Sequence, residues 1–205
     1  MNLKKMKMNK ETNPKIILIA GCNGAGKSTL APYLLRDAFG LTDYVNADTI
    51  AQGLSAFAPE KVALEAGRIM LKRLRDLARR GENFAFESTL ASRFYAWWIA
   101  ALKQQGYEFD LFFIWLVSPE LAIRRVEERV KLGGHSIESE TIRRRYKRGL
   151  KNFFELYQPL SNSWTLYDNS AVGNPILIAD KQSDAALQIH DTVLWEKICE
   201  LKNQK

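Results

Sequence analysis

Apolar residues along the chain fall into two patterns, consecutive runs and helical repeats. Consecutive apolar residues are typical of strands buried in the middle of a parallel sheet. Such strands are expected at Ile16–Ala20, Tyr44–Asn46, Phe84–Phe86, Asp110–Val117, Trp164–Tyr167 and Ile176–Ala179. A helical repeat follows Pro59 and ends near Gly81, with apolar residues at Val62, Leu64, Ile69, Met70, Leu74 and Leu77.

Other helical segments alternate with these strands. They are expected at Lys27–Ala38, Arg93–Gln105, Pro119 to about Leu132, about Ser139–Tyr157 and about Ser183–Leu201. This alternation predicts an α/β fold, with a parallel sheet of about five strands and helices on both faces. No repeat, low-complexity tract or linker divides the 205 residues, so we expect one domain over 1–205 with a flexible N-terminus at 1–14.

Ligands of such sheets bind beyond the carboxyl ends of the strands. Directly after the first strand, the sequence matches the phosphate-binding pattern GxxxxGK[ST]. Its glycines allow the backbone N–H groups to surround an anion, its lysine reaches the β- and γ-phosphates, and its hydroxyl ligates Mg²⁺. We therefore expect a P-loop nucleotide site formed by Gly21, Cys22, Asn23, Gly24, Ala25, Gly26, Lys27, Ser28 and Thr29.

Two carboxylates follow the next two strands. Asp48, 21 residues beyond Lys27, is placed to accept the proton of a substrate hydroxyl, although Asp is also a good N-cap for a helix over 49–54. Glu87 is placed to hold an Mg²⁺-bound water or a substrate hydroxyl, although it would also serve to cap a turn or pair with a lysine. Ser88, Thr89 and Arg93 are weaker candidates for the acceptor pocket.

Most of the net charge of +7 lies in residues 124–151, where ten basic residues face four acidic ones. We interpret this segment as an Arg-rich lid of two helices joined at Gly133-Gly134, closing over nucleotide phosphates. Arg125 and Arg129 are four residues apart and share a helix face, and Arg143 borders the apolar stripe of the next helix. Arg144 and Arg148 are expected to point to solvent.

Composition excludes several classes of protein. The apolar and charged fractions, 46% and 26%, are those of globular domains, and no apolar run approaches the ~20 residues of a membrane span. The basic N-terminus lacks a secretory apolar stretch, and the two cysteines form no disulfide framework. We expect a cytoplasmic protein without membrane contact. The five tryptophans are given no role in nucleic-acid binding, and Trp115 is expected in the core.

These motifs together resemble the zeta-toxin family of small P-loop kinases, in the adenylate- and shikimate-kinase-like group. The resemblance extends over about residues 15–169 and rests on Gly21–Ser28, Asn46–Asp48, Phe86–Thr89 and the segment from Arg125 to His135. It implies transfer of the ATP γ-phosphate to a hydroxyl of a UDP-amino-sugar, and an antitoxin as a partner. It also implies that Lys27 and Ser28 hold ATP and Mg²⁺.

The resemblance further implies roles for the carboxylates and arginines. Asp48 would be the base, Glu87 and Thr89 would touch substrate, and Arg125, Arg129 and Arg143 would be lid arginines. The sequence departs from the family after the Glu-x-Thr pair, because Ala91 stands where an arginine is common and Arg93 is the nearest one.

Two functions remain open at this point. The first is an ATP- and Mg²⁺-dependent kinase acting on a small molecule. The second is a P-loop ATPase that binds RNA or protein under nucleotide control, with the basic segment as its grip. The pair Asp48 and Glu87 favours the kinase, because a switch needs no base opposite the phosphates. We therefore disfavour nucleic acid as a partner.

Overall fold

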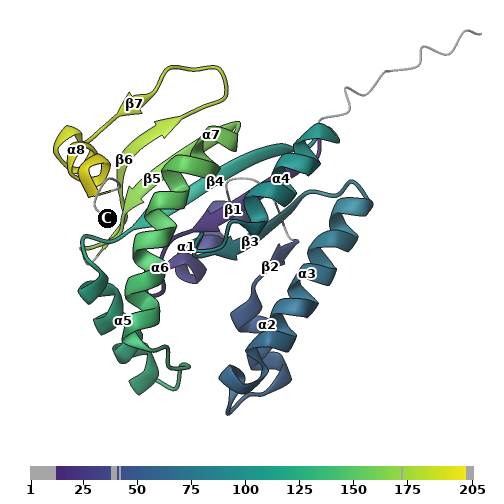
Figure 1. Ribbon diagram of the computed structural model, residues 1–205, viewed down its shortest axis with the longest axis vertical. Helices are drawn as coiled ribbons and strands as arrows, with labels where there is room; N and C mark the ends of the chain where they lie inside the picture. The colour runs from purple at the N-terminus through teal and green to yellow at the C-terminus, as the bar shows by residue number, and fades with distance from the viewer. Residues whose placement is uncertain (1–12, 38–40, 42, 172, 202–205) are drawn as a thin grey trace, which may run out of the picture.

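The fold is a seven-stranded sheet with helices on both faces (Figure 1). The computed structural model describes residues 13–37, 41, 43–171 and 173–201, so the N-terminus predicted to be flexible lies almost wholly outside the described residues. The strand order is β2-β3-β1-β4-β5-β6-β7. The strands are β1 Lys15–Ala20, β2 Tyr44–Val45, β3 Phe84–Ser88, β4 Glu108–Trp115, β5 Ser163–Asp168, β6 Ile176–Lys181 and β7 Gln188–Ile189.

The five strands β1 to β5 pair in parallel, which confirms the predicted α/β fold with a mostly parallel sheet. Strand β1 shows why a strand buried on both faces needs consecutive apolar residues. Ile16 and Leu18 pack into one core and Ile17 and Ile19 into the other, all four at most 1% exposed. Both faces of the strand are therefore covered.

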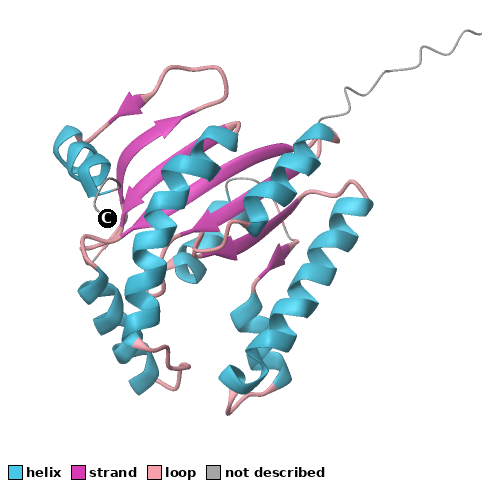
Figure 2. Cartoon of the chain, in the orientation of Figure 1, coloured by secondary structure: helices cyan, strands magenta, loops and turns pink. Residues whose placement is uncertain are grey.

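Helices cover the two faces unequally (Figure 2). One face carries α3 Ala63–Arg79, α4 Phe94–Gln104, α8 Thr192–Leu201 and the end of α6 Ser139–Asn152 with its π-helical continuation η3 Phe153–Tyr157. The other face carries α1 Lys27–Pro32, η1 Tyr33–Asp37, α5 Pro119–Lys131 and the start of α6. Three short elements complete the fold: α2 Ala47–Leu54, η2 Pro59–Val62 and α7 Gln158–Leu160.

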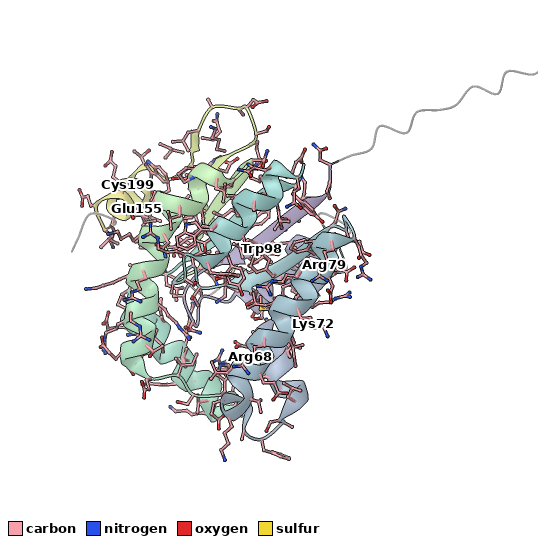
Figure 3. The ribbon with its side chains drawn as sticks, turned by 45° about the vertical axis from the view of Figure 1, so that its right-hand side comes forward. Arg68, Lys72, Arg79, Trp98, Glu155 and Cys199 are labelled. Carbon is pink, nitrogen blue, oxygen red and sulfur yellow. The ribbon has the colours of Figure 1, made fainter. Side chains whose placement is uncertain are left out.

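The helical repeat after Pro59 is confirmed, but not all of its apolar residues are buried. Met70, Leu74 and Leu77 are at most 3% exposed on the side of α3 that faces the sheet, whereas Leu64 is 83% exposed. Arg68, Lys72 and Arg79 project from the outer face of the same helix (Figure 3). The helical repeat located α3, but it did not show which of its apolar residues are covered.

The tryptophans behave as core or surface residues. Trp115 is 2% exposed, as predicted, and the ring of Trp98 packs 5.9 Å from that of Phe84 (Figure 3). Trp97, its neighbour in sequence, is 69% exposed. Successive helical residues point in different directions, so only one of the pair reaches the sheet.

The C-terminal region differs from the prediction. The expected helix from Ser183 begins only at Thr192, because the Asp191 carboxylate accepts a hydrogen bond of 2.9 Å from the Leu194 N–H and caps the helix there. The residues before it form β7, which pairs antiparallel with β6, itself antiparallel to β5. The sheet therefore has seven strands instead of about five.

The first helix also differs from the prediction. The segment expected as one helix over Lys27–Ala38 is helical to Pro32 and π-helical over Tyr33–Asp37, and Ala38 lies outside the described residues. Pro32 has no N–H to donate to the preceding turn, which interrupts the regular α-helical bonding.

Truncating Leu74 should destabilise the protein far more than truncating Leu64. Both residues lie on α3, so Leu→Ala changes helix propensity equally, but only Leu74 is fully buried. We expect Leu74→Ala to lower the free energy of unfolding by about 2–5 kcal/mol and Leu64→Ala by less than about 1 kcal/mol, measured by urea denaturation. Equal losses would contradict the placement of this helix.

Candidate active site

The loop between β1 and α1 has the backbone of a phosphate-binding loop. Gly24 and Gly26 have φ angles of 77° and 87°, which side chains other than glycine rarely adopt. Neighbouring residues also leave no room for a side chain. A Cβ on Gly24 would lie 2.7 Å from the carbonyl oxygen of Ala122 in α5, and one on Gly26 would lie 2.5 Å from the Asn169 amide. The glycines thus permit both the turn and its close packing.

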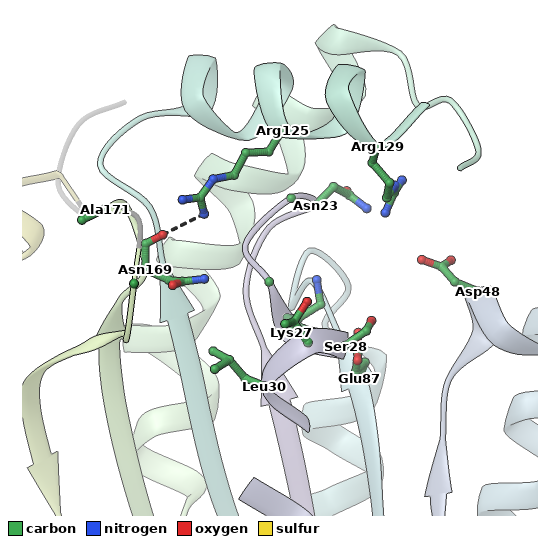
Figure 4. A pocket seen from close by; sticks show the side chains of 14 residues that line it. Asn23, Lys27, Ser28, Leu30, Asp48, Glu87, Arg125, Arg129, Asn169 and Ala171 are labelled. Atoms are coloured by element: carbon green, nitrogen blue, oxygen red, sulfur yellow. Dashed lines mark hydrogen bonds between the residues drawn. The ribbon is translucent and has the colours of Figure 1, made fainter. Parts of the chain in front are cut away.

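The loop borders a cavity of about 530 Å³ (Figure 4). This volume is in the range of small-molecule sites. Its lining comes from the loop and from the ends of several distant elements. The lining residues are Asn23, Gly24, Gly26, Lys27, Ser28, Thr29, Leu30, Asp48, Glu87, Arg125, Arg129, Asn169, Ala171 and Gly173. Of the remaining predicted loop residues, Gly21, Cys22 and Ala25 are buried beneath it.

Lys27 follows the loop as the first residue of α1. Its ammonium donates a 3.0 Å hydrogen bond to the carbonyl oxygen of Cys22. This bond folds the side chain back over the loop, next to the cavity that phosphates would occupy (Figure 4). The ammonium thus bonds to a backbone carbonyl and not to a carboxylate, so its positive charge is available to an anionic ligand.

Asp48 faces the cavity from the first turn of α2, and it is not the N-cap of that helix. The cap is Asn46, whose Oδ1 accepts from the N–H groups of Asp48 and Thr49 at 2.8 and 3.4 Å. The Asp48 side chain is 55% exposed, with its Oδ2 3.9 Å from Nε2 of His135. The capping role that the sequence left open thus belongs to a neighbour, and the Asp48 carboxylate is available to a substrate.

Glu87 lies at the end of β3, close to Ser28 in Figure 4. Its carboxylate accepts a hydrogen bond from the Tyr44 hydroxyl of the adjacent strand β2. Ser28 Oγ and the Glu87 carboxylate are oxygen donors of the kind that Mg²⁺ prefers. Among the described residues no group of three or more His, Cys, Asp or Glu side chains gathers into a metal site. The donors therefore fit an Mg²⁺ ion that takes its remaining ligands from phosphates and water.

Two of the three arginines of α5 line the cavity, and they point in different directions. Arg125 donates to the carbonyl oxygens of Asn169 and Ser170 at 2.7 and 3.1 Å, on the far side of the loop from Asp48 (Figure 4). Arg129 donates to the carbonyl oxygen of His135 at 3.1 Å. Among the described residues, its Nε is one of two buried side-chain polar atoms without a hydrogen-bond partner. A buried cationic donor of this kind at a cavity wall suits an anionic ligand.

The arginine of α6 that contacts the phosphate loop is Arg145, not Arg143, and neither of them lines the cavity. Arg143 is exposed and its Nε lies 3.5 Å from Glu120, outside the cavity. Arg145 donates a 3.1 Å hydrogen bond to Oδ1 of the loop residue Asn23. Burial lowers the pKa of the Arg145 guanidinium, and the charge of Asp48 acts in the opposite direction. Arg144 and Arg148 are exposed, as expected.

Thr89 and Arg93 do not line the cavity. The carbonyl oxygen of Thr89 lies very close to Gly149 of α6, because a Cβ added to that glycine would be 2.4 Å from it. The segment after β3 therefore packs directly on α6. Asn152 and Tyr157 hold the same segment through the carbonyl oxygens of Leu90 and Ser92, at 2.6 and 2.7 Å. Arg93 is exposed at the start of α4.

Sequence reasoning missed four residues of the site. Tyr44 begins β2, Asn46 directly follows that strand, and Asn169 follows β5. The rule that ligands bind at carboxyl ends of strands would have found Asn46 and Asn169. Asn169 donates a 2.8 Å hydrogen bond to the carbonyl oxygen of Ala25, so it supports the loop from the other side. No pattern in the sequence indicated Arg145, because a helical period does not show which side of α6 faces the phosphate loop.

Comparison with known proteins agrees with this geometry. The zeta toxin family model matches residues 2–161. The chain belongs to the zeta toxin family. An uncharacterized protein of Haemophilus influenzae is 30% identical over 132 residues, which cover 64% of this chain and 92% of that protein.

Solved structures show the same fold. An AvrRxo1-ORF1:ORF2 complex with ATP has a TM-score of 0.75 at 16% identity and is matched over 92% of this chain. The chain spans about 64% of the length of that relative. The PezAT toxin–antitoxin system of Streptococcus pneumoniae has a TM-score of 0.59 at 19% identity, covering 98% of this chain and 92% of the other. Together with the sheet and the loop, these matches confirm the predicted P-loop fold.

Cys22 should be an unreactive thiol despite its place in the phosphate loop. Burial raises its pKa to about 11, against a smaller opposing effect of Lys27, so the thiol stays protonated until the pH approaches that value. In a Cys199→Ala variant, where Cys22 is the remaining cysteine, we expect iodoacetamide to label the folded protein slowly from pH 7 to 9. Labelling in urea at the same pH is the control. Fast labelling of the folded protein would contradict this environment.

Proposed function

We propose that this protein is an ATP- and Mg²⁺-dependent kinase that transfers the γ-phosphate of ATP to a hydroxyl group of a small molecule. The observation that carries the proposal is the arrangement around one cavity. Lys27, Ser28 and Arg129 border it on the phosphate side, and Asp48 faces them from α2. A phosphoryl donor and an acceptor hydroxyl have places on opposite sides of the same space.

Each side chain has a role in this scheme. Lys27 binds the phosphates as a point charge, while Arg129 and Arg145 stabilise charge on the transferring group. Arg125, turned to the segment after β5, holds the region where the rest of the nucleotide would lie. Ser28 and Glu87 would hold Mg²⁺, which when bound would offset the negative charge of the phosphates.

Asp48 supplies the base. Its carboxylate accepts the proton of the acceptor hydroxyl as the oxygen attacks phosphorus, and the P–O bond to ADP breaks. The segments α5 and α6 act as the lid that brings Arg129 and Arg145 to the phosphates.

No helix in the described part of the chain is long and apolar enough to cross a bilayer.

The alternative of a surface that grips RNA or another polyanion has less support. In such a surface the arginines of the basic segment would face outward together. Arg125 and Arg129 instead line the cavity, and Arg145 donates to the loop residue Asn23, so three of the segment's arginines face the site.

Family membership suggests the first acceptor to test and a partner. A UDP-amino-sugar is the acceptor class that the resemblance implies, and its hydroxyls suit a carboxylate base. The AvrRxo1 and PezAT structures are a two-component complex and a toxin–antitoxin system. We propose that this chain likewise has an antitoxin partner.

The decisive experiment is phosphoryl transfer from labelled ATP. The protein is incubated with Mg²⁺, ATP and either UDP-amino-sugars or a metabolite extract, and the product is identified by mass spectrometry. A Lys27→Ala variant is the control, because Lys27 is half-buried at the start of α1 and contributes nothing to either core. A product that forms equally with this variant, or no product with any acceptor, would refute the proposal.

Asp48→Asn should lose transfer while keeping ATP. Asparagine has the same shape but cannot take the proton, so we expect kcat to fall by roughly 10²–10⁴-fold. The dissociation constant for ATP should change little, because Asp48 lies across the cavity from Lys27 and Ser28. Stability should hold, since Asn46 caps the helix. Near-normal transfer would exclude Asp48 as the base, and lost ATP binding would indicate a metal ligand instead.

Arg145→Ala and Arg144→Ala form a matched pair on α6. Arg145 reaches the loop residue Asn23, whereas the hydrogen bond of Arg144 is to Thr141 of its own helix. Removing Arg145 should lower kcat by about 10²–10³-fold, the usual effect of losing one donor to a transition-state oxyanion. Removing Arg144 should leave kcat within about twofold. If both variants lose activity equally, a diffuse charge effect explains the segment better.

A further inference from the structure

The Tyr44 hydroxyl lies between the two residues expected to hold Mg²⁺. It donates a hydrogen bond to Oε1 of Glu87 and also contacts the Ser28 hydroxyl. The same hydroxyl accepts a 3.3 Å hydrogen bond from Nδ2 of Asn46. Tyr44 begins strand β2, which pairs in parallel with β3, the strand that carries Glu87. The contact therefore joins neighbouring strands at the edge of the cavity.

Asn46 fixes the direction of this contact. Its Oδ1 accepts from two backbone N–H groups at the start of α2, so its amide has only one possible orientation. The NH₂ group must then face inward, where it donates to Ser28 Oγ and Tyr44 Oη, both at 3.3 Å. A phenol has a single proton. Because Asn46 occupies the Tyr44 oxygen as a donor, the Tyr44 proton is directed to Glu87.

This network restricts the conformations that the Glu87 side chain can adopt. A glutamate at the end of a strand has three side-chain torsions, and a hydrogen bond from a half-buried phenol selects among their rotamers. Asn46 is 7% exposed, so the anchor of the network is itself fixed by packing. Carboxylates that bind metals are usually oriented by such second hydrogen bonds, whose loss weakens metal binding by about 10–100-fold.

We propose that Tyr44, oriented by Asn46, is a positioning residue for the Mg²⁺–nucleotide site and holds Glu87 in the rotamer that reaches the ion or its bound water. This inference rests on the proposed function, because it assumes that the cavity takes Mg²⁺ with ATP. It assigns to the residues of β2 a role in the site beyond building the sheet.

The test is the Mg²⁺ dependence of ATP binding by Tyr44→Phe, which removes only the hydroxyl. ATP affinity is measured by calorimetry in EDTA and across a series of Mg²⁺ concentrations, without any acceptor. We expect the Mg²⁺ concentration at half-maximal enhancement to rise at least about tenfold. Affinity in EDTA should not change, because Lys27 and the loop N–H groups do not contact Tyr44.

Two further variants separate positioning from a general effect on the fold. Tyr95→Phe is the matched control, because Tyr95 is also half-buried and its hydroxyl contacts Met70 Sδ at 4.0 Å, away from the cavity. It should keep the wild-type Mg²⁺ dependence. In a Glu87→Gln background, Tyr44→Phe should add less than about twofold, since the two residues act through one contact.

The possible results are distinguishable. Unchanged Mg²⁺ dependence in Tyr44→Phe overturns the proposal, and so does an equal loss of ATP affinity in EDTA and in Mg²⁺, which would show that Tyr44 supports the loop. A full additional loss in the Glu87→Gln background overturns it as well. If the wild-type protein binds no ATP, or binds it without regard to Mg²⁺, the proposed function itself fails and this assignment with it.

Discussion

The tight turn of the phosphate loop is the constraint on which the rest of the structure depends. Gly21, Gly24 and Gly26 take positive φ angles so that the loop can curl around an anion. The same missing side chains let the backbones of other elements come close. A Cβ on Gly21 would lie 2.3 Å from the carbonyl oxygen of Ile114, and one on Gly24 2.7 Å from that of Ala122. Strand β4 and helix α5 are therefore set against the loop by the glycines that shape it.

That close approach brings distant cationic groups to one place. Helix α5 lies against the loop and carries Arg129, and α6 packs beside α5 and carries Arg145. Each guanidinium is partly removed from water, and the buried Nε of Arg129 has no partner in the described part of the chain. A buried cationic donor without a partner, such as Arg129 Nε, costs free energy unless an anion arrives. We interpret this cost as the energetic reason why the cavity favours phosphates.

The two carboxylates of the site have different surroundings. Asp48 lies in the first turn of α2, after β2, and Glu87 lies near the end of the adjacent strand β3. Glu87 is held by the Tyr44 hydroxyl, whereas the Asp48 side chain is 55% exposed and its Oδ2 lies 3.9 Å from Nε2 of His135. A fixed carboxylate suits metal binding and a freer one suits proton transfer to a substrate. The local hydrogen bonds thus fit the different roles that we propose for these two similar side chains.

The sequence by itself determined the fold class, the loop and the two carboxylates. Buried parallel strands require consecutive apolar residues, and a phosphate nest requires glycines at fixed spacing. Short stretches of the sequence are therefore enough to predict both features. Only the tertiary structure decided which arginine of α6 faces the loop, which residue caps α2, and how Tyr44 reaches Glu87. The contacts of Arg145 with Asn23 and of Tyr44 with Glu87 join residues 122 and 43 positions apart, so their partners depend on how whole elements pack. A helical period shows which face is buried but not what lies beside it, and this is why Arg143 was predicted where Arg145 is found.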